Sequence, residues 1–247
     1  MYCIKKRNLF LGVILAITLT LTGFTNTKVE AKKEIIETVV NYRKLNIPQY
    51  RFTENVIKDA YVFQYNGFKI TQPLKQTDKQ ALTYEQIAEE FQKLPKILTK
   101  NVNEIQLLDY RSIQDKYWEE TYGMEDFRTY AKSGDNKIYF YANSQLSANF
   151  NNNYFKIALA HELGHSFDVS ISSAKNRYSN SDEWTSIMVE DLNNKNNKYG
   201  LYCSEYSKNS NSNVEDFAES IVQYVDNKEK FAEDYPNRSK KLNELLN

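Results

Sequence analysis

Apolar residues recur along the chain with the period of a helix in some stretches and of a strand in others. The helical period predicts helices, in chain order, at 33–45, 83–94, 154–167, 180–192 and 214–224, with two short ones near 229–234 and 239–246. Runs rich in aromatic and β-branched residues predict strands at 61–65, 68–71, 104–110 and 137–142. A polar stretch at 207–213 predicts a loop, and residues 117–118 fit either state. We therefore expect an α+β fold, with a small mixed-sheet lobe to about residue 150 packed on a helical lobe after it.

Two of the predicted strands have a turn signal between them. Asn66-Gly67 separates the runs 61–65 and 68–71. A two-residue hairpin turn needs positive φ at its central residues, and Asn-Gly supplies this best. We predict a hairpin here, with a surface loop as the alternative. The strand at 137–142 precedes the 154–167 helix, so we also hypothesise that residues 137–143 form an edge strand that pairs with extended substrate. An internal strand is the alternative.

The N-terminus has the organisation of a secretory signal peptide. A basic cluster, Lys5-Lys6-Arg7, precedes an apolar run at 9–23, and Val29-Glu30-Ala31 offers a cleavage site. An uncleaved membrane anchor is the alternative, but the run is shorter than the ~20 residues that a span needs. We predict a signal peptide at 1–31 and a secreted, extracellular mature chain at 32–247. That chain should have no stable membrane association after cleavage.

Composition narrows the possible partners and cross-links. With 41% hydrophobic and 26% charged residues the chain should be globular, and its net charge of +0 argues against nucleic acid as a partner. Cys3 lies in the predicted signal peptide, so the mature chain keeps only Cys203 and has no internal disulfide. Cys203 is most simply a small buried residue; a reactive thiol and a metal ligand are the alternatives.

The segment His161-Glu162-Leu163-Gly164-His165 is an H-E-x-x-H motif, and it contains both histidines of the chain. Residues four apart on a helix share one face, so the two imidazoles can converge on one metal ion. Glu162 lies beside them, where it can act as general base on a metal-activated water. The alternative is a pair of helix-surface histidines with no ligand role.

A catalytic zinc usually takes three protein ligands and one water. The chain has no third histidine, so the third ligand must be a carboxylate or Cys203. The metzincin pattern requires glycine and histidine where this chain has Asp168 and Ile171, which excludes that class.

Glu215 is the best candidate for the third ligand. Glu219 follows it by four residues and therefore shares its helix face, from which it could accept the outer N–H of a ligand histidine. Asp216 is the competing ligand. Two solvated helix carboxylates without a metal role remain the alternative for Glu215 and Glu219.

The two segments together resemble a known family. HELGHSFD at 161–168, followed by EDFAES at 215–220, is similar to the catalytic domain of anthrax lethal factor and its relatives, which include secreted Pro-Pro endopeptidases. The resemblance covers about residues 130–247. It implies a zincin-like fold of the gluzincin type, a supporting place beside the ligands for the shared Asp168, and a tyrosine facing the substrate carbonyl oxygen. That tyrosine is Tyr206, with Tyr202 and Tyr199 as alternatives.

The expected function is that of a secreted zinc metalloendopeptidase. One Zn²⁺ per chain is expected, held by His161, His165 and Glu215, with Glu162 and Tyr206 as catalytic residues. The expected partner is a protein or peptide substrate, and the chain should be a monomer. The alternative is a catalytically silent, toxin-like component or binding module of the same fold.

Overall fold

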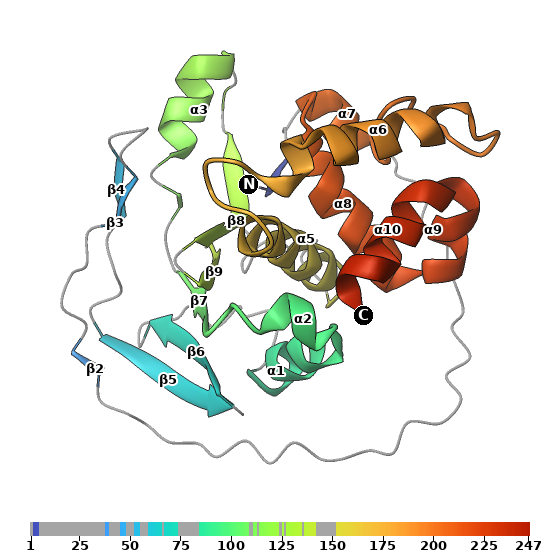
Figure 1. Cartoon of the computed structure of the whole chain (residues 1–247). Helices are drawn as coiled ribbons and strands as arrows, with labels where there is room; N and C mark the ends of the chain where they lie inside the picture. The colour runs from blue at the N-terminus through green and yellow to red at the C-terminus, as the bar shows by residue number, and fades with distance from the viewer. Residues whose placement is uncertain are drawn as a thin grey trace.

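The protein combines one mixed β-sheet with a group of helices (Figure 1). The computed structural model describes residues 2–4, 38–39, 45–47, 52–54, 59–65, 67–73, 84–108, 111–112, 114–123, 125, 127–134, 136–141 and 152–247. The described residues therefore form an α+β fold, as predicted. The apolar run at 9–23 lies outside them, and none of the helices within them is long and apolar enough to cross a bilayer.

The sheet has seven strands in the order β1-β8-β9-β7-β6-β5-β2. Their bounds are Tyr2–Ile4 (β1), Thr38–Val39 (β2), Asp59–Tyr65 (β5), Phe68–Pro73 (β6), Glu104–Leu107 (β7), Arg128–Gly134 (β8) and Lys137–Phe140 (β9). β7 pairs in parallel with β6 and β9, and the other neighbours are antiparallel. A separate two-stranded sheet joins β3 (Leu45–Ile47) to β4 (Phe52–Glu54).

The predicted hairpin is confirmed. β5 and β6 pair antiparallel with Tyr65 opposite Phe68, and Gly67 has a φ of 93°. That conformation is one that a residue with a Cβ adopts only under strain, so the glycine is required by the turn. The strands predicted at 104–110 and 137–142 are also confirmed in their first four residues, as β7 and β9.

Most of the helices in the described residues follow the sheet strands in the chain, from residue 152 onward. Their bounds are Tyr84–Lys93 (α1), Lys96–Thr99 (α2), Asp115–Tyr122 (α3), Asn152–Ser170 (α5), Asp182–Glu190 (α6), Glu205–Ser210 (α7), Asn213–Asp226 (α8), Lys228–Asp234 (α9) and Pro236–Leu246 (α10). Two 3-10 turns, η1 (Tyr178–Asn180) and η2 (Asp191–Asn193), flank α6. The ambiguous residues 117–118 thus lie in a helix, α3.

The core lies between one face of the sheet and the helices α1 and α5. Ile70, Ile105 and Ile138 lie side by side on the neighbouring strands β6, β7 and β9, and all three are fully buried in the core. Phe140 of β9 contacts Phe155 of α5 with ring centroids 4.8 Å apart. α5 lies between the sheet and the C-terminal helices (Figure 1), and Leu163 in its middle has no exposed surface. A helix in this position is apolar on most sides, so polar residues on it need partners.

Two predictions of local structure are wrong. Within the predicted helix 33–45, Thr38–Val39 form strand β2 and Leu45 begins β3; the remaining positions lie outside the described residues. The predicted loop at 207–213 is mostly helical, because α7 spans residues 205–210. Ser204 caps that helix by accepting from the Ser207 N–H, so these polar side chains serve as caps and not as loop residues.

The edge-strand hypothesis for residues 137–143 is also wrong. β9 has β8 on one side and β7 on the other, so it is an internal strand. β8 lies outside it, and β1 pairs with the free side of β8. Residues 142 and 143 lie outside the described residues.

Candidate metal centre

Helix α5 brings both histidines to one face. His161 and His165 are one turn apart, with imidazole centroids 4.6 Å apart and ring planes perpendicular. His161 is fully buried and His165 is 5% exposed. The helix is long enough, and packed closely enough on the sheet, to fix these two side chains before any ligand arrives.

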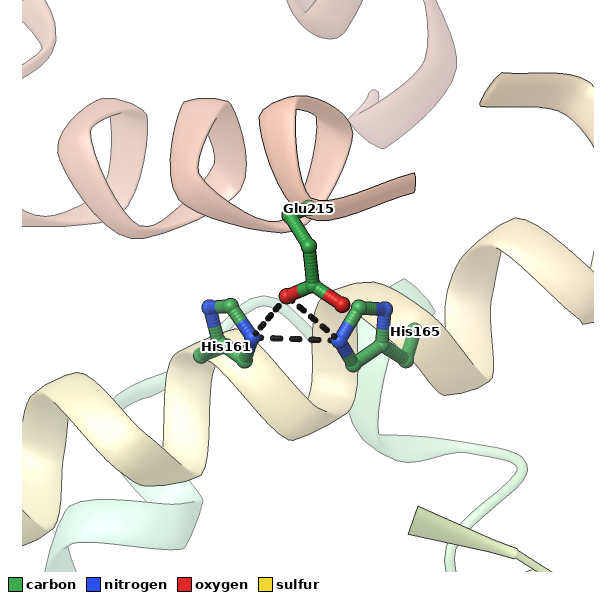
Figure 2. A group of neighbouring side chains, drawn as sticks. All are labelled: His161, His165 and Glu215. Atoms are coloured by element: carbon green, nitrogen blue, oxygen red, sulfur yellow. Dashed lines mark hydrogen bonds and ion pairs between the residues drawn. The ribbon is translucent and has the colours of Figure 1, made fainter. Parts of the chain in front are cut away.

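Helix α8 brings the third candidate ligand. Ser212 caps its N-terminus by accepting a hydrogen bond from the Glu215 N–H, which places Glu215 in the first turn. The Glu215 carboxylate points down from α8 toward the two imidazoles of α5 (Figure 2). Glu215 is thus 50 or more residues from the two histidines in the sequence, and the fold brings the three side chains into contact.

The three donor atoms have the spacing of a metal site. His165 Nε2 lies 3.0 Å from His161 Nε2, and Glu215 Oε2 lies 3.1 Å from His161 Nε2 and 3.5 Å from His165 Nε2. Two ligands at about 2.1 Å from one tetrahedral zinc ion are about 3.4 Å apart, so these separations fit a single small cation. His161, His165 and Glu215 could therefore hold a metal ion.

Charges in the site favour a cation. Burial alone would lower the pKa of His161, but the carboxylates of Glu215 and Glu219 raise it to about 9. Burial would raise the pKa of Glu215, but neighbouring positive charge and hydrogen bonds from His161 and His165 hold it well below its usual range. A metal ion competes with protons for these same atoms, so the carboxylates that stabilise a protonated His161 would stabilise a bound cation instead.

Glu219 lies behind His161. Its Oε1 is 2.8 Å from His161 Nδ1, one helical turn beyond Glu215 on the same face of α8. A hydrogen bond from Nδ1–H to this carboxylate fixes the ring and leaves the Nε2 lone pair directed at the metal position. The structure thus brings Glu219 to the place that the sequence analysis gave it.

Glu162 is fully buried beside the ligands. Burial by itself would raise the pKa of its carboxyl, but the surrounding positive charge, His165 and His161 included, lowers it. The lowered pKa favours the ionised carboxylate, which is the state that a general base requires.

Tyr206 contacts the site from α7. Its ring lies 5.7 Å from that of His161, with the two planes at 74°. The hydroxyl of Tyr202, by contrast, donates to Asn211 at 2.8 Å. Among the three candidate tyrosines in the described stretch 199–206, Tyr206 is the one whose ring packs on a candidate ligand.

Asp168 does not support a ligand, which corrects the expectation for it. Its carboxylate accepts hydrogen bonds from the Ser179 N–H at 2.8 Å, the Ser179 hydroxyl at 2.7 Å and Arg177 at 3.4 Å. None of its hydrogen bonds within the described residues goes to His161 or His165. Through these contacts, Asp168 holds the segment with Arg177 and Ser179 against the C-terminal end of α5.

The competing ligands face away from the site. Asp216 accepts from the Cys203 N–H at 2.7 Å and from Arg238, and its side chain is fully buried on the far side of α8. Cys203 is buried, and burial raises the pKa of its thiol well above the usual range. Both residues are structural in this fold, and the contact with Arg238 had no signal in the sequence.

Comparison with known proteins finds no matching family model and no matching curated relative.

Proposed function

We propose that the protein is a secreted, zinc-dependent metalloendopeptidase with a zincin-like fold, similar to the lethal-factor group. The convergence of two imidazoles and one carboxylate within hydrogen-bonding distance of each other carries this proposal. Two histidines and a glutamate are the donor set of many catalytic zinc sites, in which the fourth position stays open for water or substrate. Secretion is inferred from the signal-peptide pattern at 1–31.

Bound zinc would supply Lewis acidity to the scissile carbonyl and would lower the pKa of a water toward ~7. His161, His165 and Glu215 would hold the ion. Glu219 would keep the His161 ring in the tautomer that presents Nε2. This arrangement places the supporting carboxylate on the same helix as the third ligand, so one helix sets both.

Glu162 would act as the general base. Its carboxylate would take a proton from the attacking water and then deliver it to the leaving amine of the peptide bond. Burial opposes ionisation of this carboxyl, but the surrounding positive charge lowers its pKa and so favours the carboxylate that accepts the proton. Tyr206 would donate a hydrogen bond to the developing oxyanion, a contact whose loss typically costs about 10²–10³ in rate.

The substrate would be a protein or peptide, cut by a monomeric enzyme outside the cell. A general base and an oxyanion donor suit the hydrolysis of an amide carbonyl, and the amide bonds of a peptide chain are the substrate that we propose. A proteome-derived peptide library, incubated with the purified chain, would supply the cleavage sequence and a substrate for rate measurements.

The test compares Glu162→Gln with Glu215→Ala. Glu162→Gln should retain zinc, and its cleavage rate should fall about 10²–10⁴-fold, because the change removes the base and leaves the ligands. Glu215→Ala should lose both zinc and activity. Zinc is measured by elemental analysis, and Glu229→Gln, a change at an exposed position on α9, serves as the control.

A chelator gives an independent arm of the same test. Removing zinc should lower the unfolding temperature of the wild-type chain, since a ligand that binds only the folded state stabilises it. The chelator should leave the unfolding temperature of Glu215→Ala nearly unchanged, because that variant holds no zinc to remove. A wild-type chain without zinc, or a Glu162→Gln chain that cleaves at the wild-type rate, would contradict the proposal.

A further inference from the structure

Arg238 of α10 is a fully buried cation that joins three separate parts of the helical region. Its Nε donates to Asp216 of α8 at 3.1 Å, its Nη1 to Asp191 of η2 at 3.2 Å, and its Nη2 to the Leu201 carbonyl at 2.6 Å. The Arg238 main-chain N–H also donates to Asp191 at 3.0 Å. One side chain therefore ties α10 to α8, to η2 and to the segment before α7.

Both carboxylates that face Arg238 are themselves buried. Asp191 and Asp216 have no exposed surface. Such groups need charge and hydrogen-bond partners, and a guanidinium can serve two carboxylates and a carbonyl at once, because its donors lie in a rigid planar fork. Lysine has a single ammonium and cannot make the same set of contacts.

The network ends next to the metal centre. Asp216 directly follows Glu215 in the first turn of α8, and its Oδ1 also accepts from the Cys203 N–H at 2.7 Å. Cys203 precedes the cap of α7, the helix that carries Tyr206. The carbonyl of Cys203 accepts in turn from the Tyr235 hydroxyl at 3.1 Å. The contacts around Asp216 thus fix the turn with Glu215 and the start of the helix with Tyr206 relative to each other.

We propose that Arg238 is a positioning residue of the metal centre, which holds Glu215 and Tyr206 in register through Asp216. This inference rests on the proposed function, since it assigns Arg238 a role at the same zinc site. Arg238 touches neither the ligands nor substrate in this scheme; it acts through the backbone of two helices.

The experiment compares Arg238→Lys with Leu242→Ala in the intact chain. Leu242 is a fully buried core residue one turn further along α10, so its truncation destabilises the same helix without touching the network. The zinc dissociation constant is measured by competition with a chromophoric chelator, at a temperature where both variants are folded by circular dichroism. The rate and KM are measured on the peptide that the wild-type chain cleaves.

Arg238→Lys should raise the zinc dissociation constant about 10-fold or more over that of Leu242→Ala, which is the size of effect seen when groups that orient metal ligands are removed. It should also lower kcat while KM stays the same, because Tyr206 would be displaced from the position of the developing charge. If Arg238→Lys does not fold, Asp216→Asn is measured in its place against the same expected values, since it keeps the shape of the side chain.

The outcomes separate the two proposals. A wild-type chain that binds zinc and cleaves peptide, with an Arg238→Lys variant that matches Leu242→Ala in zinc affinity and kcat, would overturn the positioning role alone. A wild-type chain that binds no zinc would overturn the proposed function together with it. Weaker zinc binding in Arg238→Lys than in Leu242→Ala would support both.

Discussion

Gly164 of α5 lies directly against Ala218 of α8. A Cβ placed on Gly164 would come within 2.9 Å of the Ala218 Cα, 3.3 Å of its Cβ and 3.4 Å of its carbonyl oxygen. Gly164 precedes His165, and Ala218 precedes Glu219, so this close contact between the two helices lies beside the candidate metal centre. Two small residues at this crossing allow a carboxylate on one helix to reach imidazoles on the other.

Gly164→Ala should therefore weaken metal binding although alanine is the better helix former. The added methyl group must push the α8 backbone away, and such overpacking typically costs about 1–3 kcal/mol, more than the ~1 kcal/mol that alanine gains in a helix. Urea unfolding and zinc titration measure the two effects. Gly134→Ala, where an added Cβ meets nothing within 4 Å, is the control. Unchanged zinc affinity in Gly164→Ala would contradict the importance of this contact.

Glu219→Gln should weaken zinc binding about 10-fold, because the amide still accepts from His161 Nδ1 but no longer supplies the charge that makes the imidazole a better ligand. Glu219→Ala, which also removes the hydrogen bond, should have the larger effect. Competition with a chelator measures both variants. Equal affinities for Glu219→Gln and the wild-type chain would remove Glu219 from the site.

Asp168→Ala should destabilise the fold without disturbing the metal centre. The change leaves the Ser179 N–H and hydroxyl without their buried acceptor, which costs about 1–3 kcal/mol of the free energy of unfolding. Zinc affinity should stay within about twofold, since a change away from the ligands that keeps the fold has a small effect there. A loss of zinc affinity comparable with that of Glu219→Gln would return Asp168 to the metal site.

Glu104 of β7 should make the fold sensitive to acid. Burial would raise the pKa of its carboxyl, but an ion pair with Lys137 at 2.7 Å and hydrogen bonds from Thr71 and Gln106 lower it below the model-peptide value of 4.5. The contribution of Glu104 to stability is thus fully present above the unfolded pKa and is lost as pH falls through the lower, folded pKa.

Glu104→Gln should accordingly be less stable than the wild-type chain near neutral pH and should lose less stability when it is acidified. Urea unfolding at about pH 7 and at pH values below about 4 measures the difference. Glu229→Gln, at an exposed position, should change neither value. The same pH dependence in Glu104→Gln and the wild-type chain would show that the other carboxylates account for the acid sensitivity.

Local sequence patterns correctly predicted the elements that depend on a backbone conformation or on a single buried face. The Asn66-Gly67 turn, the strand at 137–142 and the helix around His161 are of this kind, because turn chemistry and apolar period act over a few residues. The helix prediction for 33–45 was wrong because its apolar positions fit either period. Thr38–Val39 form a strand because they pair with β5. The 207–213 stretch failed because serine and asparagine can cap a helix as well as form a loop.

The sequence by itself determined that His161 and His165 share one helical face and that Glu215 and Glu219 share another, since residues four apart on a helix are always neighbours. The tertiary structure decided which faces meet. Neighbouring positions on a helix point about 100° apart, so Glu215 faces α5 while Asp216 faces Arg238, and only the packing of α8 between those two helices distinguishes them. The roles of Asp168 and Gly164 likewise depend on partners distant in the chain, which no local pattern contains.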